Sequence, residues 1–190
     1  MSRPTPALYQ DALLVIRYLE RHKDVGLRYS PSRDRMYGMT DANWDVKHST
    51  SGYVFMFQSA AISWSSKKQK TIALSTCEAE IVAASEATRE GLSLRALIDD
   101  LGFGDPSPTK LYCDSQATIA TAYNPEHYTK MKHVERRHFF VRECIENHQI
   151  VVPFVSTHEN IADFFTRALD PKDFFRIRNK IMNHKTSIDD

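Results

Sequence analysis

Residues 71–87 read T-I-A-L-S-T-C-E-A-E-I-V-A-A-S-E-A, a short apolar run that turns into a helix. Ser75, followed three residues later by Glu78, forms a capping box in which the hydroxyl and the carboxylate each accept a hydrogen bond from an unpaired amide. Glu78 therefore has a structural task. Glu80 lies about 200° further around the helix at ~3.6 residues per turn, so capping does not account for it. Glu80 is then either an exposed acid favoured by the helix macrodipole or a functional carboxylate.

The composition favours one globular domain. The chain has 190 residues, 42% of them hydrophobic and 26% charged, which is enough to bury a core and leave short extensions at the ends. The formal net charge of +1 is close to neutral, so a nucleic-acid partner would have to bind a local basic patch. The N-terminus has no apolar signal core, and no run approaches the ~20 apolar residues that span a bilayer. We therefore expect a soluble protein that is not secreted and does not bind a membrane.

The cysteines argue against two further classes of protein. Cys77, Cys113 and Cys144 are an odd number without a C-x-x-C pair, which favours a reducing compartment over a disulfide framework. Cysteine and histidine pairs with tolerable ligand spacing occur, but no second pair completes a four-ligand set for zinc. Neither a disulfide-stapled domain nor a structural zinc site is expected.

Residues 1–35 are predicted to form a helix and a linker ahead of the main domain. Thr5 is an N-cap, Pro6 occupies the first helical position, and the helix is expected to end near His22. The apolar side of this helix, which we interpret as packing surface, consists of Leu8, Ala12, Val15, Ile16 and Leu19. The polar, proline-containing segment 30–35 is typical of a linker.

Residues 36–170 are predicted to form the main domain, of the α/β class. Three β-type runs at 36–41, 52–57 and 60–66 with short joins indicate an antiparallel meander. The helix that starts in the opening stretch continues to about Leu101, and the strand at 109–113 then implies a parallel crossover.

The remaining elements complete the predicted domain. Residues 115–122 and 133–147 are expected to be helical, and the strand at 149–156 is placed at an edge because Pro153 interrupts it. A helical pattern starting near Glu159 carries Ile161, Ala162, Phe165 and Leu169. Asp170 and Pro171 start a further helix, so residues 171–190 are predicted to be a C-terminal helix and tail.

Asp41, Glu80, Asp114 and Asp163 stand at the places where an open α/β sheet gathers functional groups. If the strand at 36–41 lies beside the strand at 109–113, Asp41 and Asp114 are neighbours, and the two helices bring the other acids over the same spot. Four clustered carboxylates raise one another's pKa unless cations compensate their charge, and hard oxygen ligands suit Mg²⁺ or Mn²⁺. The alternative for Asp41 is an ordinary aspartate at a strand end.

Seven short sequence words occur in an order that resembles one family. They are T-D-A-N-W (40–44), S-T-S-G-Y (49–53), I-S-W-S-S-K-K-Q-K (62–70), L-S-T-C-E-A-E (74–80), L-Y-C-D-S-Q (111–116), K-H-V-E (132–135) and A-D-F-F-T-R (162–167). Together they resemble the ribonuclease H domain of copia-type LTR retrotransposon Pol polyproteins. Residues 17–29 resemble the connection between the polymerase and ribonuclease H regions of that family.

The resemblance implies a fold, an activity and a cofactor. The fold is ribonuclease H-like, a five-stranded mixed sheet with an antiparallel meander and then parallel strands, flanked by helices. The activity is hydrolysis of the RNA strand of RNA–DNA hybrids with two Mg²⁺ ions, for which Mn²⁺ is a substitute. By motif, Asp41 would bridge both ions, Glu80 and Asp114 would hold the ion on the leaving-group side, and Asp163 would help to hold the other. The implied setting is a cytoplasmic virus-like particle with the polymerase module as partner.

Further residues are candidates for nucleic-acid contact by the same resemblance. Asn43 belongs to the first word, and Gln116 is a candidate for reading the RNA minor groove, or else a plain exposed helix residue. The candidate phosphate contacts are Lys67, Lys68, Lys70, Lys130, Lys132 and His133, each with solvated charge as the alternative. His158, five residues before Asp163, is a candidate for assisting product release, although its spacing differs from that of cellular ribonucleases H.

Departures from the family pattern leave other functions open. The segment from Asp41 to Ser49 is short, Asn43 replaces a common aspartate, Ile81 replaces a tyrosine, and Arg136 and His138 are also unusual. One alternative is therefore a catalytically weakened domain that binds hybrids or acts as a scaffold. Another is a DNA-cutting nuclease on the same fold, such as an integrase or resolvase relative.

Overall fold

The computed structural model describes residues 4–124 and 135–184. The elements in chain order are α1 (Pro6–Arg21), β1 (Tyr37–Asn43), β2 (Thr50–Phe57), β3 (Ala60–Lys68), α2 (Thr76–Asp100), β4 (Thr109–Tyr112), α3 (Gln116–Tyr123), α4 (Glu135–Glu146), β5 (Ile150–Val151), the 3₁₀ helix η2 (Ile161–Phe165) and α5 (Pro171–Met182). Within these residues, no helix combines the length and the apolar character needed to cross a membrane.

The strands form one five-stranded mixed sheet in the order β3-β2-β1-β4-β5. The meander β1–β2–β3 is antiparallel, whereas β4 pairs with β1, and β5 with β4, in parallel. The predicted α/β class and sheet are therefore confirmed. The last strand lies at an edge as expected, but it covers only Ile150–Val151 and ends before Pro153 instead of running from 149 to 156. The division of the chain at residues 35 and 170 stays a prediction.

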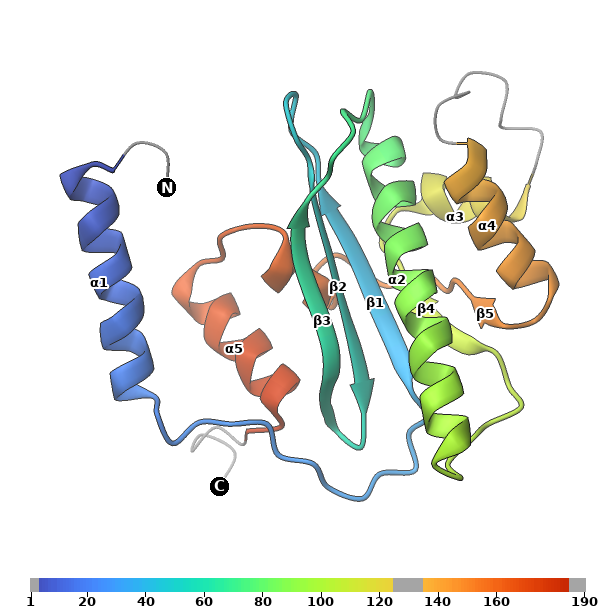
Figure 1. Ribbon diagram of the computed structural model, residues 1–190, viewed down its shortest axis with the longest axis horizontal. Helices are drawn as coiled ribbons and strands as arrows, with labels where there is room; N and C mark the ends of the chain where they lie inside the picture. The colour runs from blue at the N-terminus through green and yellow to red at the C-terminus, as the bar shows by residue number, and fades with distance from the viewer. Residues whose placement is uncertain (1–3, 125–134, 185–190) are drawn as a thin grey trace.

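Side chains alternate along the strands and create a core on each face of the sheet. Figure 1 shows α2 and α5 on opposite sides of the sheet. On one face, Phe55 packs with Ala87 of α2 and Leu111 of β4. On the other, Val54 and its neighbours pack with η2 and with Ile177 and Ile181 of α5. Asp41 is two residues from Met39 in β1, so both side chains point to the face of the sheet that η2 covers.

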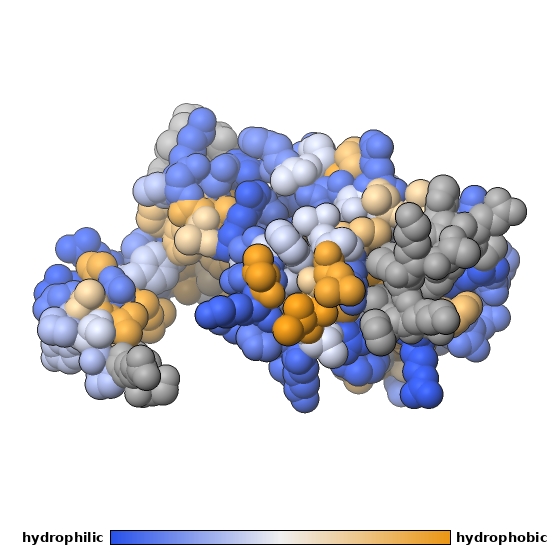
Figure 2. Space-filling model, turned by 90° about the horizontal axis from the view of Figure 1, so that it is seen from above, coloured by the Kyte–Doolittle hydropathy of each residue, from blue (hydrophilic) through white to orange (hydrophobic). Residues whose placement is uncertain are grey.

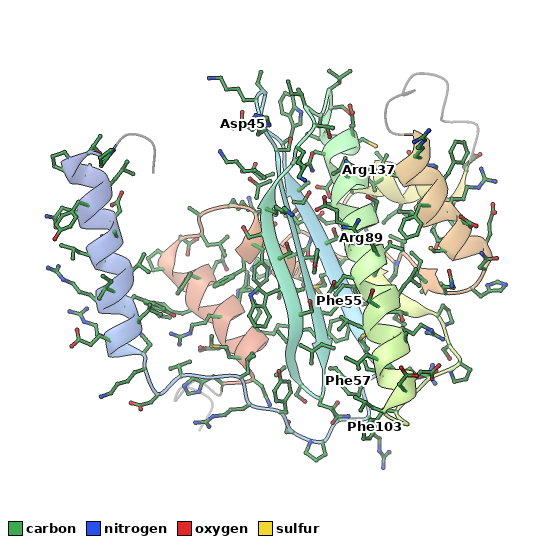
Figure 3. The ribbon with its side chains drawn as sticks, viewed as in Figure 1. Asp45, Phe55, Phe57, Arg89, Phe103 and Arg137 are labelled. Atoms are coloured by element: carbon green, nitrogen blue, oxygen red, sulfur yellow. The ribbon has the colours of Figure 1, made fainter. Side chains whose placement is uncertain are left out.

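Helix α2 lies close to the sheet because of two glycines. A Cβ atom at Gly91 would lie 2.9 Å from Cζ of Phe55, and one at Gly38 of β1 would lie 2.6 Å from Cε1 of the same ring. The Phe55 ring, labelled in Figure 3, therefore sits between a glycine of the sheet and a glycine of the helix.

Two predictions about helices are wrong. The pattern from Glu159 to Leu169 forms only the five-residue η2, because Asn160 caps it and Thr166 turns its hydroxyl to the sheet. The apolar side of α1 is not packing surface in this chain: no residue of α1 is buried, and Leu19 is 61% exposed. The aromatic contacts of α1 are at its C-terminal end, where the ring of Tyr18 contacts the ring of Phe174.

Candidate metal centre

Four chain segments bring the four predicted acids to one end of the sheet. Asp41 is in β1, Asp114 follows β4, Glu80 is in α2, and Asp163 is in η2. Carboxylate oxygens of Asp41, Asp114 and Asp163 lie within 4.8 Å of one another, and Glu80, Asp114 and the sulfur of Cys113 form a second such group. Asp114 belongs to both groups, so the four acids form one connected cluster.

The parallel pairing of β1 and β4 explains two of these positions. Met39 is opposite Tyr112, and Asp41 and Asp114 each follow two residues later, so both emerge at the carboxyl ends of neighbouring strands. Open α/β sheets bind ligands at this edge. Glu80 reaches the same edge from α2, where its Oε1 accepts a hydrogen bond from the amide of Ala42 at 3.2 Å.

Asp163 is held over the sheet by the two residues that flank η2. The side chain of Asn160 donates to the carbonyl of Thr40 at 3.0 Å and accepts from the amide of Ala162 at 3.1 Å. The hydroxyl of Thr166 donates to Oδ2 of Asp41. The bonds from Asn160 to Thr40 and from Thr166 to Asp41 tie the 3₁₀ turn to β1, so the Asp163 carboxylate is fixed relative to Asp41.

Gly52 allows η2 to approach the sheet. It lies opposite Asp41 in the antiparallel pairing of β1 with β2. A Cβ atom at this position would lie 2.6 Å from Cγ2 of Thr166 and 2.9 Å from Cβ of Phe165. A larger residue would push η2, and Asp163 with it, away from the cluster.

Burial and mutual repulsion raise the proton affinity of two acids. Burial is the main cause that raises the pKa of Asp41 to about 6, and the charges of Asp163 and Asp114 add to it against the Thr166 hydrogen bond. Burial likewise raises the pKa of Glu80 to about 9, with Asp41 and Asp114 contributing and the Ala42 amide opposing. Without compensating cations, Glu80 therefore keeps its proton at neutral pH.

The donor set fits hard divalent cations. Oε2 of Glu80 is buried and has no hydrogen-bond partner among the described residues. Because buried polar atoms normally have a partner, this oxygen fits the role of a cation ligand. The other contributors are carboxylate oxygens, which suit Mg²⁺ or Mn²⁺. Burial raises the pKa of the Cys113 thiol well above its usual range, so this neutral sulfur is a poor ligand for such ions.

Two curated proteins align with almost the whole length of this chain. It is 34% identical over 186 residues to the retrovirus-related Pol polyprotein from transposon TNT 1-94 of Nicotiana tabacum, which covers 96% of the chain. It is 31% identical over 186 residues, or 95% of the chain, to that from transposon RE2 of Arabidopsis thaliana. The chain spans 14% and 13% of these two longer proteins. No family model matches the sequence.

Solved structures of ribonucleases H share the fold. The domain superposes on LC11-RNase H1, isolated from compost, with a TM-score of 0.54 and 16% identity over 70% of this chain and 92% of that one. The same enzyme in complex with an RNA/DNA hybrid gives a TM-score of 0.51 at 14% identity, over 70% of this chain and 94% of that one.

The homologues of this chain are retrovirus-related Pol polyproteins from plant transposons, and the chain has the ribonuclease H fold.

In this ribonuclease H-like domain, the candidate nucleic-acid residues that the structure describes are all exposed. They are Asn43 at the end of β1, Lys67 and Lys68 at the end of β3, Lys70 in the following loop and Gln116 at the start of α3. Lys130, Lys132 and His133 lie outside the described residues. Gln116 is two residues beyond Asp114, so it starts its helix beside the acid cluster.

His158 is exposed, and its described contacts lie at the start of α5. Its carbonyl accepts a hydrogen bond from Arg176 at 3.2 Å, and its charge acts on Asp173. The described interactions do not connect it with the four acids, so its role in product release stays a prediction.

Two of the unusual residues serve the packing of the ribonuclease H domain. His138 is buried in α4, and its Nε2 pairs with the carbonyl of Thr121 in α3 at 2.6 Å. Burial lowers the pKa of His138, which favours the neutral ring. Ile81 is buried in the core beside Glu80, whereas Arg136 is exposed.

Thr166 and Arg167 contact the acid cluster and were not among the predicted site residues. Arg167 forms an ion pair with Asp163, and Thr166 binds Asp41. Both residues stand in the word A-D-F-F-T-R, three and four positions after Asp163. That spacing places side chains on one side of a helical turn and could have identified them.

Glu78 has the structural role predicted for it. The hydroxyl of Ser75 accepts from the Glu78 amide at 3.1 Å, and Oε2 of Glu78 accepts from the amide of Leu74 at 2.7 Å, one residue earlier than in the usual capping box. We expect Glu78→Ala to lower the free energy of unfolding by about 1–2 kcal/mol, because the Leu74 amide loses its partner. Urea unfolding measures this change, and an unchanged stability would contradict the capping role.

Proposed function

We propose that this domain is a metal-dependent endonuclease that hydrolyses the RNA strand of RNA–DNA hybrids during retrotransposon reverse transcription. The observation that carries the proposal is the cluster of four acids at the carboxyl ends of β1 and β4, with a buried, unpartnered oxygen on Glu80. The ribonuclease H fold and the Pol polyprotein relatives support the same activity. A ribonuclease H1 of this fold has been solved with an RNA/DNA hybrid, which is the substrate class we assign.

The proposed cofactor is Mg²⁺, as two ions, with Mn²⁺ as a substitute. Asp41, Asp114 and Asp163 form one ligand group, and Glu80 joins Asp114 in the other. When bound, a pair of such ions stabilises the attacking and leaving oxygens of an in-line phosphodiester displacement.

The chain's own residues orient this centre. Thr166 fixes one oxygen of Asp41, and Asn160 fixes η2, which carries Asp163. Arg167 forms an ion pair with Asp163 and is 49% exposed, so its guanidinium reduces the charge of the cluster where substrate would arrive. In the absence of cations, the raised pKa of Glu80 keeps that carboxyl neutral at pH 7, so cation binding would release its proton.

The surroundings of the centre suit a nucleic-acid partner. Lys67, Lys68 and Lys70 are exposed next to the start of α2, and we assign them to phosphate contacts that position the substrate without reading its sequence. Asn43 and Gln116 flank the acids and are assigned to the RNA strand. We also propose that the domain works beside a polymerase module in a cytoplasmic virus-like particle, since its relatives are several times longer than this chain.

A panel of labelled duplexes tests the activity. With Mg²⁺ present, we expect the RNA strand of an RNA–DNA hybrid to be cut internally, and double-stranded or branched DNA to be left intact. Asp41→Asn should abolish this cutting because it removes one negatively charged ligand from the group that Asp41 forms with Asp114 and Asp163. Cleavage of DNA duplexes would instead indicate another nuclease on this fold, and hybrid binding without cleavage would indicate a binding module.

The pKa shifts predict how pH acts on the metal-free protein. Asp41 titrates near 6 instead of 3.8 and Glu80 near 9 instead of 4.5, so between these limits the folded state holds protons that the unfolded state has lost. Stability should therefore fall as pH rises from 5 to 9 in EDTA, by on the order of 1 kcal/mol for Asp41 alone and by more for Glu80. Saturating Mg²⁺ should flatten this dependence because it compensates the carboxylate charges.

Thermal unfolding between pH 5 and 9, in EDTA and in Mg²⁺, measures this effect. Glu80→Gln serves as the control and should remove most of the decrease above pH 6, because glutamine does not ionise. A wild-type stability in EDTA that rises across this range, or no effect of Mg²⁺ at pH 8, would contradict the assignment.

A further inference from the structure

The face of the sheet that carries the acids continues toward the amino ends of β1 and β4. Tyr37 and Met39 lie four and two residues before Asp41 in β1. In β4, which pairs with β1, Tyr112 lies two residues before Asp114. Because side chains two residues apart point to the same face, these two tyrosines and the methionine share the face of the acids. Two residues of strand span about 6.6 Å, so this part of the face begins one short step behind the acid cluster.

The helices leave part of this face open. Among the described residues, η2 packs on β1 and β2, and α5 packs on β3. Helices α2 and α4 contact β4 and β5 from the opposite side of the sheet. A hollow of about 670 Å³ lies on the open part, where Tyr112 of β4 and Val151 of β5 line it. Its volume is within the ~300–1,000 Å³ that small-molecule sites commonly have.

The floor of this hollow is aromatic, and we call it the tyrosine hollow. Tyr37, Met39 and Tyr112 line it. The two tyrosine rings meet edge to face, with 6.0 Å between their centroids and an interplanar angle of 88°. An edge-to-face contact occupies only one face of one ring, so a planar ligand can stack on another. Burial, Asp34 and Tyr112 raise the pKa of Tyr37, so its hydroxyl remains a hydrogen-bond donor at neutral pH.

Cations stand at the rim of the tyrosine hollow. Arg33, Arg35 and Lys110 line it beside one acid, Asp34. Arg35 is paired with Asp105. Arg33 and Lys110 are exposed, and neither forms an ion pair with any residue that the structure describes. These two cations are therefore available to bind a negatively charged group that enters the hollow.

We propose that the tyrosine hollow binds one nucleotide, with its base against the rings of Tyr37 and Tyr112 and its phosphate against Arg33 and Lys110. Every base has a planar face that stacks on aromatic side chains, and arginine and lysine bind phosphate. The nucleotide is either a free mononucleotide or the unpaired end of a strand, since both present a base next to a phosphate. This site goes beyond the proposed function, because it requires neither cleavage nor a metal ion.

Calorimetric titration with adenosine 5′-monophosphate in EDTA tests the tyrosine hollow. We expect Arg33→Gln with Lys110→Gln to weaken binding of this nucleotide about tenfold, and to leave binding of adenosine, which lacks the phosphate, unchanged. Tyr112→Leu should weaken binding of both about tenfold, because the stacked ring is lost. The matched control is Arg17→Gln with Arg21→Gln, which removes two exposed charges from α1. Figure 1 shows α1 on the other side of the molecule from β4 and β5, and Figure 2 shows it at the edge of the molecule.

A short single-stranded oligoadenylate with a 5′-phosphate separates the two sources of the nucleotide. If it competes with the mononucleotide at equal or higher affinity, the site takes strand ends, and if only the mononucleotide binds, the site takes free nucleotides; both results support the proposal.

Three results would overturn the proposal. The first is no binding of the mononucleotide at about 10 mM. The second is equal affinity in the variant without the two rim cations and in the control. The third is equal affinity of the wild type for inorganic phosphate and for the mononucleotide, because the rings would then contribute nothing. If Tyr112→Leu does not fold, the rim cations still decide, since their exposed side chains can be replaced without disturbing the core.

Discussion

Glu80→Gln is expected to abolish Mg²⁺-dependent cleavage of an RNA–DNA hybrid, by about 10³-fold or more, and to leave the protein folded. The carboxylate is expected to contribute charge and an oxygen ligand, and losing several kcal/mol of transition-state stabilisation accounts for an effect of this size. Folding should persist because the raised pKa keeps the Glu80 carboxyl neutral at pH 7 in the metal-free protein, and glutamine has the same shape and no charge. Single-turnover cleavage, together with thermal unfolding in EDTA, measures both effects.

Glu78→Ala is the matched comparison because Glu78 stands two residues away in the same helix. Its carboxylate binds the Leu74 amide, so this variant should lose stability and keep most of its cleavage. If Glu80→Gln retained activity and Glu78→Ala lost it without loss of stability, the roles assigned to the two acids would be wrong.

Gly52→Ala is expected to destabilise the domain by about 1–3 kcal/mol and to reduce cleavage beyond what the lost stability explains. The added methyl would meet Cγ2 of Thr166 at 2.6 Å and Cβ of Phe165 at 2.9 Å, so η2 would have to move off the sheet. Asp163 moves with η2, and the bond from Thr166 to Asp41 is strained or lost. Urea unfolding and cleavage under conditions where the variant is fully folded separate the two effects.

Gly26→Ala is the control for a glycine replaced where space is free. A Cβ atom at Gly26 has nothing within 4 Å, so this change should alter neither stability nor cleavage. If Gly52→Ala and Gly26→Ala had the same stability and the same cleavage rate, the close approach of η2 to Gly52 would not be what positions Asp163.

Local sequence signals predicted much of the fold and the acid cluster. Thr5, Ser75 and Asp170 are N-caps as expected, since capping depends only on neighbouring residues. The placement of Asp41 beside Asp114 followed from the parallel crossover, which a strand-helix-strand order implies. Glu80 could be predicted as a member of the cluster because it lies about 200° around the helix from Glu78, so it cannot share the capping role of Glu78.

Features that depend on distant contacts were not predictable in the same way. The 3₁₀ form of η2 results from the bonds of Asn160 to Thr40 and of Thr166 to Asp41, which join residues more than a hundred positions apart. The pattern of α1 predicts an apolar side correctly, but periodicity does not reveal whether another element covers it.

The most direct test of the central claim is a cleavage assay on a hybrid whose RNA strand is labelled at one end. The four-acid cluster predicts internal cuts in the RNA strand with Mg²⁺, none in EDTA, and recovery when Mg²⁺ is restored. Cutting that persists in EDTA, or an intact RNA strand with Mg²⁺ and folded wild-type protein, would contradict it.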